Sequence, residues 1–434
     1  MSEARAFLLL GGYRVIARNW GFLADLAGRG LRILLITSEQ WRADTTAAMA
    51  RGEGPGTYLT DAAFVTGEVG IEGSFTSGVV AHVQRWQQEY DIVGVYAAGE
   101  MLVEQTGIVA DALGLPGPGV RAARVCRNKY LQRFYLPQWS PRLVVVPPQG
   151  RAGLDVGPVR FPVVLKPSGR RSSSGVRAVR DPEALPALLT EYPAAETLLV
   201  EEYVTGAEYS VEAVVQHGRI VFESATQKRT TEDGSDWFVE MAHTVPAPPG
   251  AEHERLLAAN RDIVGRLGLV AGIVHTELRL DRDGRPVLME VAARTPGDGI
   301  MPLYHLATGR ALEQTIMEVA LDEPAAHPPP RRYARQVYLP QPRGTLQDVK
   351  LRWPGVEPQW VPEGQPWPVI APGEADDPPA LRHVIVLKER GARLGELRES
   401  GDRGVTFLID APTLDDLDEL ERQVSAAIDI IVDP

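Results

Sequence analysis

The sequence predicts an α/β protein that is built from several domains. From Ala6 to about residue 118, short apolar runs alternate with amphipathic stretches, which is the pattern of buried parallel strands joined by helices. The chain has 434 residues, and a prior of roughly 150 residues per domain suggests two to four packed units. A third observation is Asp283-Gly284, a strong hairpin signal between two strand-like segments.

The composition indicates a globular protein without a nucleic-acid or membrane partner. Hydrophobic residues make up 44% of the chain, charged residues make up 24%, and the formal net charge is −12. No long basic run could neutralise a phosphate backbone. No segment approaches the roughly 20 apolar residues of a membrane span, and the apolar run near the start is too short for a secretory signal. We therefore expect a cytoplasmic protein.

Its single cysteine, Cys126, excludes an intramolecular disulfide.

Two stretches rich in proline, residues 115–119 and 324–330, divide the chain. We expect four units, which are an N-terminal α/β domain over 1–118, a small subdomain over 119–204, a larger subdomain over 205–330 and a strand-rich domain over 331–434. The last unit shows no set of residues typical of chemistry, so we expect it to cap the molecule or to form an interface.

Hydrophobic periodicity predicts the individual elements. The expected strands are Ala6–Leu10, Leu31–Ile36, Ile92–Val95, Leu143–Val146, Val163–Lys166, Leu198–Glu202, Tyr209–Gln216 and Ile220–Thr226. The expected helices are Arg18–Arg29, Glu100–Leu113, Arg121–Tyr135, Pro182–Thr190, Glu252–Leu267 and Leu414–Ile428. Most of the candidate motifs below lie at the ends of these strands or on the loops that follow them.

The hairpin sets two carboxylates against each other. A two-residue turn at Asp283-Gly284 places Glu277 opposite Glu290, and Leu280 opposite Val287. Directly opposed like charges, with Cβ atoms about 5 Å apart, are unfavourable. A divalent cation resolves the conflict, because Mg²⁺ commonly takes one or two carboxylates together with substrate phosphates. The alternative is that Arg279 or Arg294 neutralises the pair.

A loop of small polar residues follows the strand that ends at Lys166. Glycine and serine let backbone N–H groups approach phosphate oxygens, and a lysine at the end of an apolar strand needs an anionic partner. The order differs from the GxxxxGK[ST] loop, because the lysine comes first. A flexible surface hairpin is the alternative. The loop residues are Ser172, Ser173, Ser174 and Gly175.

The segment Glu201 to Glu208 links two strands through a short Gly-containing stretch. Such a link is a hinge between two sheets, and its backbone could pair with a flat heterocycle. The alternative is that these acidic strand ends are simply solvated edge residues.

Taken together, these segments resemble the ATP-grasp superfamily, and within it the L-amino acid ligases, which are carboxylate–amine ligases that join amino acids. The resemblance runs in order from about Ala6 to Ala320 and includes Lys129 in the motif Arg-Asn-Lys-Tyr. In this chain Glu-Val-Ala-Ala-Arg replaces the more widespread Glu-x-Asn-x-Arg, so that Ala292 stands where many members carry a metal-binding asparagine. The resemblance implies ATP between two α+β lobes, a Rossmann-like N-terminal domain and a strand-rich C-terminal domain.

The resemblance also implies roles for individual residues around ATP. Lys129 and Lys166 would contact the phosphates, and the loop with Ser172, Ser173, Ser174 and Gly175 would close over them as a lid. Glu201 and the backbone of Glu202 and Val204 would contact adenine, with Glu208 on the ribose. Glu277 and Glu290 would hold Mg²⁺, with two ions expected and Mn²⁺ as an alternative metal.

The candidate catalytic residues are Arg294 and His275. A guanidinium beside the glycines of residues 295–299 could stabilise an acyl phosphate and the oxyanion formed when an amine attacks. Strand alternation puts His275 on the same face as Glu277, although a single histidine is often structural. Candidate substrate contacts, each also compatible with a surface role, are Glu100, Glu240, His243, Gly297 and Asp298. Glu100 could receive a substrate ammonium, and Asp298 could give a more open pocket or one that favours a cation.

The expected activity is an ATP-dependent ligase that makes an amide or peptide bond through an acyl phosphate and releases ADP and phosphate. Its expected partners are a small carboxylate and an amine, with amino acids favoured. A carboxylase, a purine-pathway ligase and a nucleotide-binding module without catalysis are the alternatives. The sequence leaves the oligomeric state open, a homodimer included.

Overall fold

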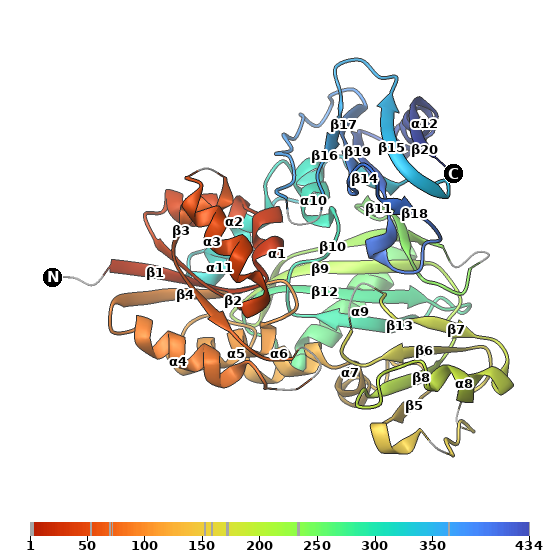
Figure 1. Cartoon of the computed structure of the whole chain (residues 1–434), viewed down its shortest axis with the longest axis horizontal. Helices are drawn as coiled ribbons and strands as arrows, with labels where there is room; N and C mark the ends of the chain where they lie inside the picture. Colours follow the sequence, from red (N-terminus) through yellow and green to blue (C-terminus); the bar gives the residue numbers. More distant parts are fainter. Residues whose placement is uncertain are drawn as a thin grey trace.

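The computed structural model describes residues 4–52, 54–68, 71, 73–151, 153–157, 159–170, 173–231, 235–362 and 365–433. Within these residues the strands form four sheets. Figure 1 shows the N-terminal lobe at the left, a small lobe at the lower right, and a large sheet that runs from the centre to the C-terminal strands at the top.

The N-terminal lobe is a parallel sheet in the order β3-β2-β1-β4. Its strands are β1 (Ala4–Gly11), β2 (Arg32–Ser38), β3 (Leu59–Val65) and β4 (Tyr90–Ala98). The three predicted strands are confirmed; β3 escaped prediction because Thr60 and Asp61 interrupt its apolar pattern. The helices of this lobe are α1 (Tyr13–Arg18), α2 (Gly21–Gly28), α3 (Arg42–Ala50), α4 (Thr76–Trp86) and α5 (Val103–Leu113). The predicted helix Arg18–Arg29 is confirmed as α2 over Gly21–Gly28, but it begins later than predicted, since the chain turns at Asn19 between α1 and α2.

The small lobe is an antiparallel sheet in the order β5-β8-β6-β7 with its own apolar core. Its elements are β5 (Leu143–Val146), β6 (Val163–Pro167), β7 (Arg177–Val179), β8 (Leu198–Glu202) and α8 (Leu185–Leu189). The predicted helix Arg121–Tyr135 is two helices, α6 (Val120–Arg127) and α7 (Lys129–Tyr135), because Asn128 is extended, with φ −129° and ψ 111°. This break puts Lys129 at the start of α7.

The large sheet has nine strands in the order β13-β12-β9-β10-β11-β14-β19-β17-β16. The strands are β9 (Glu208–Gln216), β10 (Arg219–Thr230), β11 (Glu240–Val245), β12 (Gly272–Leu280), β13 (Pro286–Ala292), β14 (Tyr333–Tyr338), β16 (Pro358–Trp360), β17 (Ala380–Val386) and β19 (Val405–Ala411). Because β11 pairs with β14, the sheet continues across residue 330, where we expected a domain boundary. The division into four units stays a prediction.

The remaining elements cover this sheet or extend the C-terminal part. They are α9 (Ala251–Leu267), α10 (Ile300–Thr308), α11 (Leu312–Ala320), α12 (Leu414–Ala427), and a small sheet of β18 (Arg393–Leu394), β15 (Gly344–Leu351) and β20 (Ile428–Asp433). One apolar core joins the N-terminal lobe, α11, the large sheet and the C-terminal strands, and it includes Phe22, Ile273, Met317 and Leu408. The N-terminal lobe is therefore packed against the large sheet and the C-terminal strands rather than loosely linked to them.

The hairpin of β12 and β13 keeps the predicted pairing of Glu277 with Glu290, but its turn differs from the prediction. Leu280 pairs with Pro286 instead of Val287, because Gly284 has positive φ (69°) whereas Asp283 does not, so the turn is longer than two residues. A register shift between Glu277 and Leu278 then restores the expected alignment. Two deviations thus cancel at the carboxylates.

That register shift leaves Met289 as an extra residue on β13. Its carbonyl oxygen accepts hydrogen bonds from Arg133 Nη2 at 2.7 Å and from Lys166 Nζ at 3.4 Å. The bulge therefore directs a backbone acceptor towards two cations that come from other elements.

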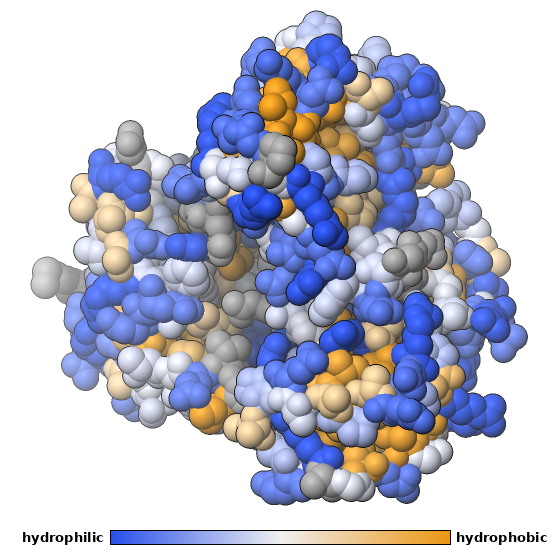
Figure 2. Space-filling view, turned by 45° about the vertical axis from the view of Figure 1, so that its right-hand side comes forward, coloured by the Kyte–Doolittle hydropathy of each residue, from blue (hydrophilic) through white to orange (hydrophobic). Residues whose placement is uncertain are grey.

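The face of the molecule shown in Figure 2 is largely hydrophilic. In Figure 2 most side chains on the visible face are hydrophilic, and the apolar patches lie apart from one another. Among the described residues, none of the helices combines the length and the apolar character that crossing a bilayer requires.

Gln132 joins α7 to the edge strand β13. Its buried side chain donates to the carbonyl of Val291 at 3.0 Å and accepts from the N–H of Val291 at 3.0 Å. It also donates to the carbonyl of Cys126 at 3.1 Å. An amide side chain thus takes the place that a further strand would have beside β13.

We expect Gln132→Leu to lower the free energy of unfolding by about 2–4 kcal/mol, because two buried backbone groups of Val291 lose their partner. Gln88→Leu, at an exposed position after α4, is the matched control and should change it little. Denaturant unfolding of both variants is the measurement, and equal midpoints for the two would contradict this role of Gln132.

Candidate active site

A cavity of about 1200 Å³ lies where the N-terminal lobe, the small lobe and the hairpin meet. Almost all the site residues expected from the sequence line it. They are Glu100, Lys129, Lys166, Ser173, Ser174, Glu201, Glu202, Val204, Glu208, Glu240, His243, His275, Glu277, Glu290, Arg294, Gly297 and Asp298. Gly175 is not among the lining residues, and its carbonyl accepts a hydrogen bond from the Tyr192 hydroxyl at 2.7 Å. Ser172 lies outside the described residues.

The two predicted lysines reach the cavity from different elements. Lys129, at the start of α7, places its Nζ 2.9 Å from Glu290 and donates to the carbonyl of Arg170 at 2.8 Å. Lys166, on β6, places its Nζ 2.6 Å from Glu201. Both side chains are buried, so each ammonium depends on nearby oxygen atoms for its stability.

Glu201 is enclosed by cations. Arg133 Nε lies 2.7 Å from one oxygen, and Lys166 lies 2.6 Å from the other. Burial raises the pKa of Glu201, but Arg133 and Lys166 outweigh that effect and hold it below its ordinary value. Both oxygens therefore have partners within the protein, and the side chain orients Lys166.

A third lysine of the cavity, Lys228 on β10, was not predicted from the sequence. Its Nζ lies 2.5 Å from Glu277, 3.7 Å from Glu208 and 3.9 Å from Glu240. Burial alone would lower the pKa of Lys228, yet these carboxylates raise it above its ordinary value. Its place in the polar run Gln-Lys-Arg-Thr suggested a solvated strand end; the signal that could have found it is the alternation of side chains along β10.

The carboxylates around Lys228 form a candidate cation site. Among the described residues, Glu208, Glu240 and Glu277 each offer an oxygen atom, and these atoms lie within 4.8 Å of one another. Glu290 is not part of that group but stands directly across the hairpin from Glu277. Carboxylate oxygens are the ligands that Mg²⁺ prefers, so the donor set fits this ion.

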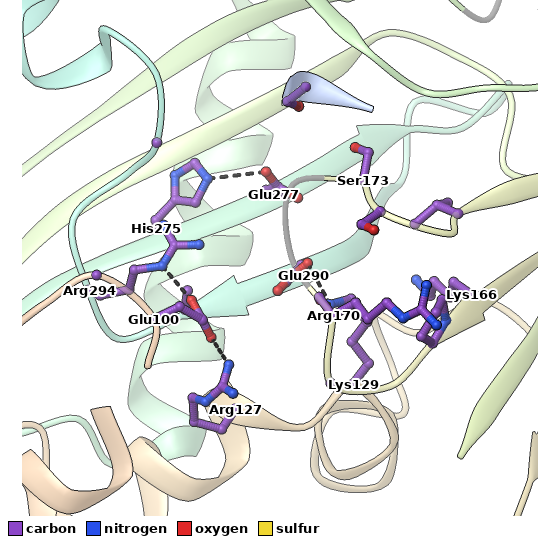
Figure 3. Close-up of a pocket in the computed structure, with 18 of the residues that line it drawn as sticks. Glu100, Arg127, Lys129, Lys166, Arg170, Ser173, His275, Glu277, Glu290 and Arg294 are labelled. Carbon is purple, nitrogen blue, oxygen red and sulfur yellow. Dashed lines mark hydrogen bonds and ion pairs between the residues drawn. The ribbon is translucent and has the colours of Figure 1, made fainter. Parts of the chain in front are cut away.

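His275 connects Glu277 to a buried carboxylate that we had not predicted, Glu212. Its Nδ1 lies 2.7 Å from Glu212 and its Nε2 lies 3.2 Å from Glu277, as Figure 3 shows for the second contact. Burial would lower the pKa of His275, but the two carboxylates raise it. Glu212 is fixed in turn by the hydroxyl groups of Ser210, Thr226 and Tyr304, at 2.6 to 2.9 Å.

The alternative in which an arginine neutralises the hairpin carboxylates is wrong. Arg279 pairs with Glu208 at 2.6 Å, and Arg294 pairs with Glu100. Lysines take that place, Lys228 at Glu277 and Lys129 at Glu290.

Glu100 lies between two guanidinium groups. One oxygen accepts from Arg127 at 2.5 Å, and the other accepts from Arg294 Nε (Figure 3). Burial raises the pKa of Glu100, but Arg294 and Arg127 lower it further, so the carboxylate stays charged. We had expected Glu100 to receive a substrate ammonium; its oxygens instead orient Arg294 and Arg127.

The C-terminal segment contributes to the cavity, which corrects our expectation that it carries no chemistry. Arg403 grips both oxygens of Asp298, at 2.7 and 2.9 Å, and His243 Nε2 lies 2.8 Å from the second. Arg403 also donates to the carbonyl of Glu240 at 2.9 Å, and the hydroxyl of Ser400 donates to its carboxylate at 2.9 Å. The cation that Asp298 was expected to favour is thus supplied by the chain itself.

Comparison with known families identifies the central part of the chain. Residues 159–302, which include β6 to β13, match the family model described as the ATP-grasp domain. The chain contains an ATP-grasp domain. Lysines and glutamates of this domain, including those on the hairpin, line the cavity described above.

Similar proteins extend this result beyond the ATP-grasp domain. Alanine–anticapsin ligase of Bacillus subtilis (strain 168) is 25% identical over 272 residues, which cover 56% of this chain and 56% of that protein. D-alanine–D-alanine ligase of Geobacter sulfurreducens is 28% identical over 192 residues, 42% of this chain and 60% of that protein. The chain thus spans little more than half the length of these curated relatives.

The fold of the whole chain is also that of a solved structure. The crystal structure of an L-amino acid ligase from Bacillus licheniformis superposes with a TM-score of 0.74 and covers 100% of both chains, at 19% identity. The fold shared with that structure therefore includes the N-terminal lobe and the C-terminal strands.

Lys166 gives the site a testable pH dependence. Burial, with Arg133 and Lys129 nearby and Glu201 opposing them, lowers the pKa of Lys166 to about 8. Its ammonium is charged below this pH and neutral above it, so we expect the affinity for ATP to fall as the pH rises through 8, by at most about tenfold per pH unit.

Calorimetric titration with ATP on both sides of that pH is the measurement. Lys166→Arg is the control, because a guanidinium keeps its charge up to a pKa above about 12 and should flatten the dependence. An affinity that is constant in the unchanged protein would contradict the role of Lys166 in phosphate binding.

Proposed function

We propose that the protein is an ATP- and Mg²⁺-dependent ligase that joins a carboxylate to an amine, with amino acids as substrates. Release of ADP and phosphate would accompany the formation of an amide or peptide bond. The names of the two curated relatives, which are ligases of alanine, support this substrate class.

The observation that carries the proposal is the gathering of three lysines and the hairpin carboxylates in one cavity with Arg294. Lys129, Lys166 and Lys228 supply the positive charge that a triphosphate requires, and they come from α7, β6 and β10. A site that only stored a nucleotide would not need a further guanidinium, held by Glu100, beside these groups.

Glu277 and Glu290 are the residues that would hold Mg²⁺, with Glu208 and Glu240 close enough to contribute. When bound, the ion neutralises phosphate charge and orients the terminal phosphoryl group. Two ions are proposed, and Mn²⁺ should substitute because it shares the preference for oxygen ligands. Lys228 and Lys129, which pair with these carboxylates, would then turn to the phosphates.

ATP would lie between the small lobe and the large sheet. Backbone groups of Glu202 and Val204 would contact adenine, and Glu208 would contact the ribose. Ser173 and Ser174 line the same cavity as Lys166, and their loop would cover the phosphates and exclude water. Glu201 would keep Lys166 oriented rather than bind adenine through its side chain.

The chemistry requires a charged carboxylate to attack a charged phosphoryl group. The lysines lower the repulsion between these two anions by position and electrostatics, so that an acyl phosphate can form. Arg294, which Glu100 fixes, would then stabilise the oxyanion that develops when the amine attacks. His275 would act as a positioning residue for Glu277, since both its nitrogens are engaged by carboxylates.

The end of the cavity near the C-terminal segment would bind substrate. Glu240, His243, Gly297 and Asp298 line it, and the contacts of Arg403 with Glu240 and Asp298 fix its shape. Glu240 then replaces Glu100 as the candidate partner of a substrate ammonium.

A matrix of amino acids, alone and in pairs, together with N-acetylated amino acids that carry a carboxylate but no free amine, tests the proposal. We expect phosphate release from ATP only when both a carboxylate and an amine are present, together with a product whose mass is that of the two minus water. Phosphate release in the absence of an amine would count against a ligase. The absence of phosphate release with every pair of amino acids would also count against it.

The Glu290→Gln variant tests the metal arrangement. We expect turnover to fall by about 100-fold or more, because the ion supplies several kcal/mol of charge stabilisation and each factor of ten is about 1.4 kcal/mol. Glu254→Gln, at an exposed position on α9, is the matched control. Near-normal turnover of Glu290→Gln at limiting Mg²⁺ would refute the role of the hairpin.

A further inference from the structure

Arg18 is a cation at the cavity wall that the proposed reaction does not use. It is the last residue of α1, it lines the cavity, and its side chain is half-buried. Its guanidinium lies over the ring of Trp367, with the central carbon 3.9 Å from the ring centroid. This contact fixes the position of a charge that would otherwise move freely in solvent.

No carboxylate of the described residues forms an ion pair with Arg18. The acidic group that faces it is Asp298, whose two oxygens are taken by Arg403 and His243. Tyr338 and Arg403 also face Arg18, and burial lowers its pKa. One positive charge is therefore left over at this end of the cavity.

The geometry of the stack determines what Arg18 can bind. A guanidinium that lies on an aromatic face still presents N–H groups along its edge, in a fork that matches the two oxygens of a carboxylate. An uncompensated, partly desolvated charge also favours an anionic partner over a neutral one.

Arg18 has different partners from Lys129 and Lys166. Its guanidinium lies on Trp367, whereas Lys129 pairs with Glu290 and Lys166 pairs with Glu201. We therefore assign the anion at Arg18 to a group other than the triphosphate and the carboxylate that reacts with it.

We propose that Arg18 binds a carboxylate of the amine substrate, so that this substrate is an amino acid or a related compound that carries a carboxylate besides its amine. The inference rests on the proposed function and names the substrate class of the same site. The carboxylate is either the α-carboxylate or a side-chain carboxylate, and the test distinguishes the two.

Steady-state kinetics of Arg18→Gln provide the test. We expect the KM for the amine substrate to rise about 10- to 100-fold, the loss typical of a charge-assisted hydrogen-bonded pair, with the KM for ATP unchanged. Arg14→Gln is the matched control, because Arg14 lies on the same helix but already pairs with Asp44 at 3.1 Å. Arg18→Lys, which keeps the charge and loses the fork, should fall between.

Amide analogues of the amine substrate identify the carboxylate. An amide in place of the α-carboxylate, or glutamine in place of glutamate, should bind the unchanged enzyme weakly and should be insensitive to Arg18→Gln. The analogue whose KM does not change in Arg18→Gln identifies which carboxylate Arg18 binds. The proposal is overturned if Arg18→Gln leaves the KM for the amine unchanged, raises it equally for acid and amide, or raises only the KM for the carboxylate that becomes phosphorylated.

Direct binding separates this proposal from the ligase assignment. If no pair of amino acids reacts, calorimetric titration of the full chain with L-glutamate and L-glutamine, in the presence of ADP and Mg²⁺, still reports on Arg18. A preference for glutamate that disappears in Arg18→Gln supports the anion site, and equal affinities in the unchanged protein overturn it. The melting temperature of Arg18→Gln should fall by at most a few degrees, about 2–4 °C, because the stack on Trp367 is lost but no ion pair within the protein is.

Discussion

The central constraint on this structure is the concentration of negative charge around one strand, β12. Glu277 lies on it, Glu208 and Glu290 lie on its two neighbours, and Glu240 follows on β11. Carboxylates that are withdrawn from water cost several kcal/mol each unless a cation accompanies them, as a general estimate. The chain supplies the cations from elsewhere, chiefly through Lys228 of β10 and Lys129 of α7. Neutralising the hairpin therefore ties together elements that are distant in sequence.

The backbone near the hairpin serves the same arrangement. The bulge at Met289 presents a carbonyl to Arg133 and Lys166, and Gln132 occupies the free edge of β13. Both contacts hold the small lobe and α7 against the edge of the large sheet. The lysines thus reach the cavity from elements whose positions are fixed by backbone hydrogen bonds, as electrostatic preorganisation requires.

Two clusters beyond the lysines share one arrangement, two arginines around one carboxylate. Glu100 lies between Arg127 and Arg294, and Asp298 pairs with Arg403, with Arg18 nearby and His243 also in contact. In each cluster the two arginines carry one more positive charge than the carboxylate neutralises. A carboxylate fixes the geometry of the arginines in each case, and the remaining charge is available to an anion. This pattern suits a cavity that must bind anionic groups at more than one place.

The sequence by itself determined local features, which are most of the strands before residue 230, the hairpin, and the order of motifs that indicates an ATP-grasp domain. These depend on periodicity and turn chemistry within short segments, and so the facing of Glu277 and Glu290 could be predicted even though the turn was not. Only the tertiary structure decided which cation accompanies which carboxylate. Glu212, Arg403 and Arg18 carry no local signal, because their roles arise from contacts across elements far apart in the chain. For Lys228 the alternation along β10 indicates only which face it is on, and not the carboxylates that it meets there. Which charges neutralise each other depends on distances in the folded structure, and no short sequence motif encodes those distances.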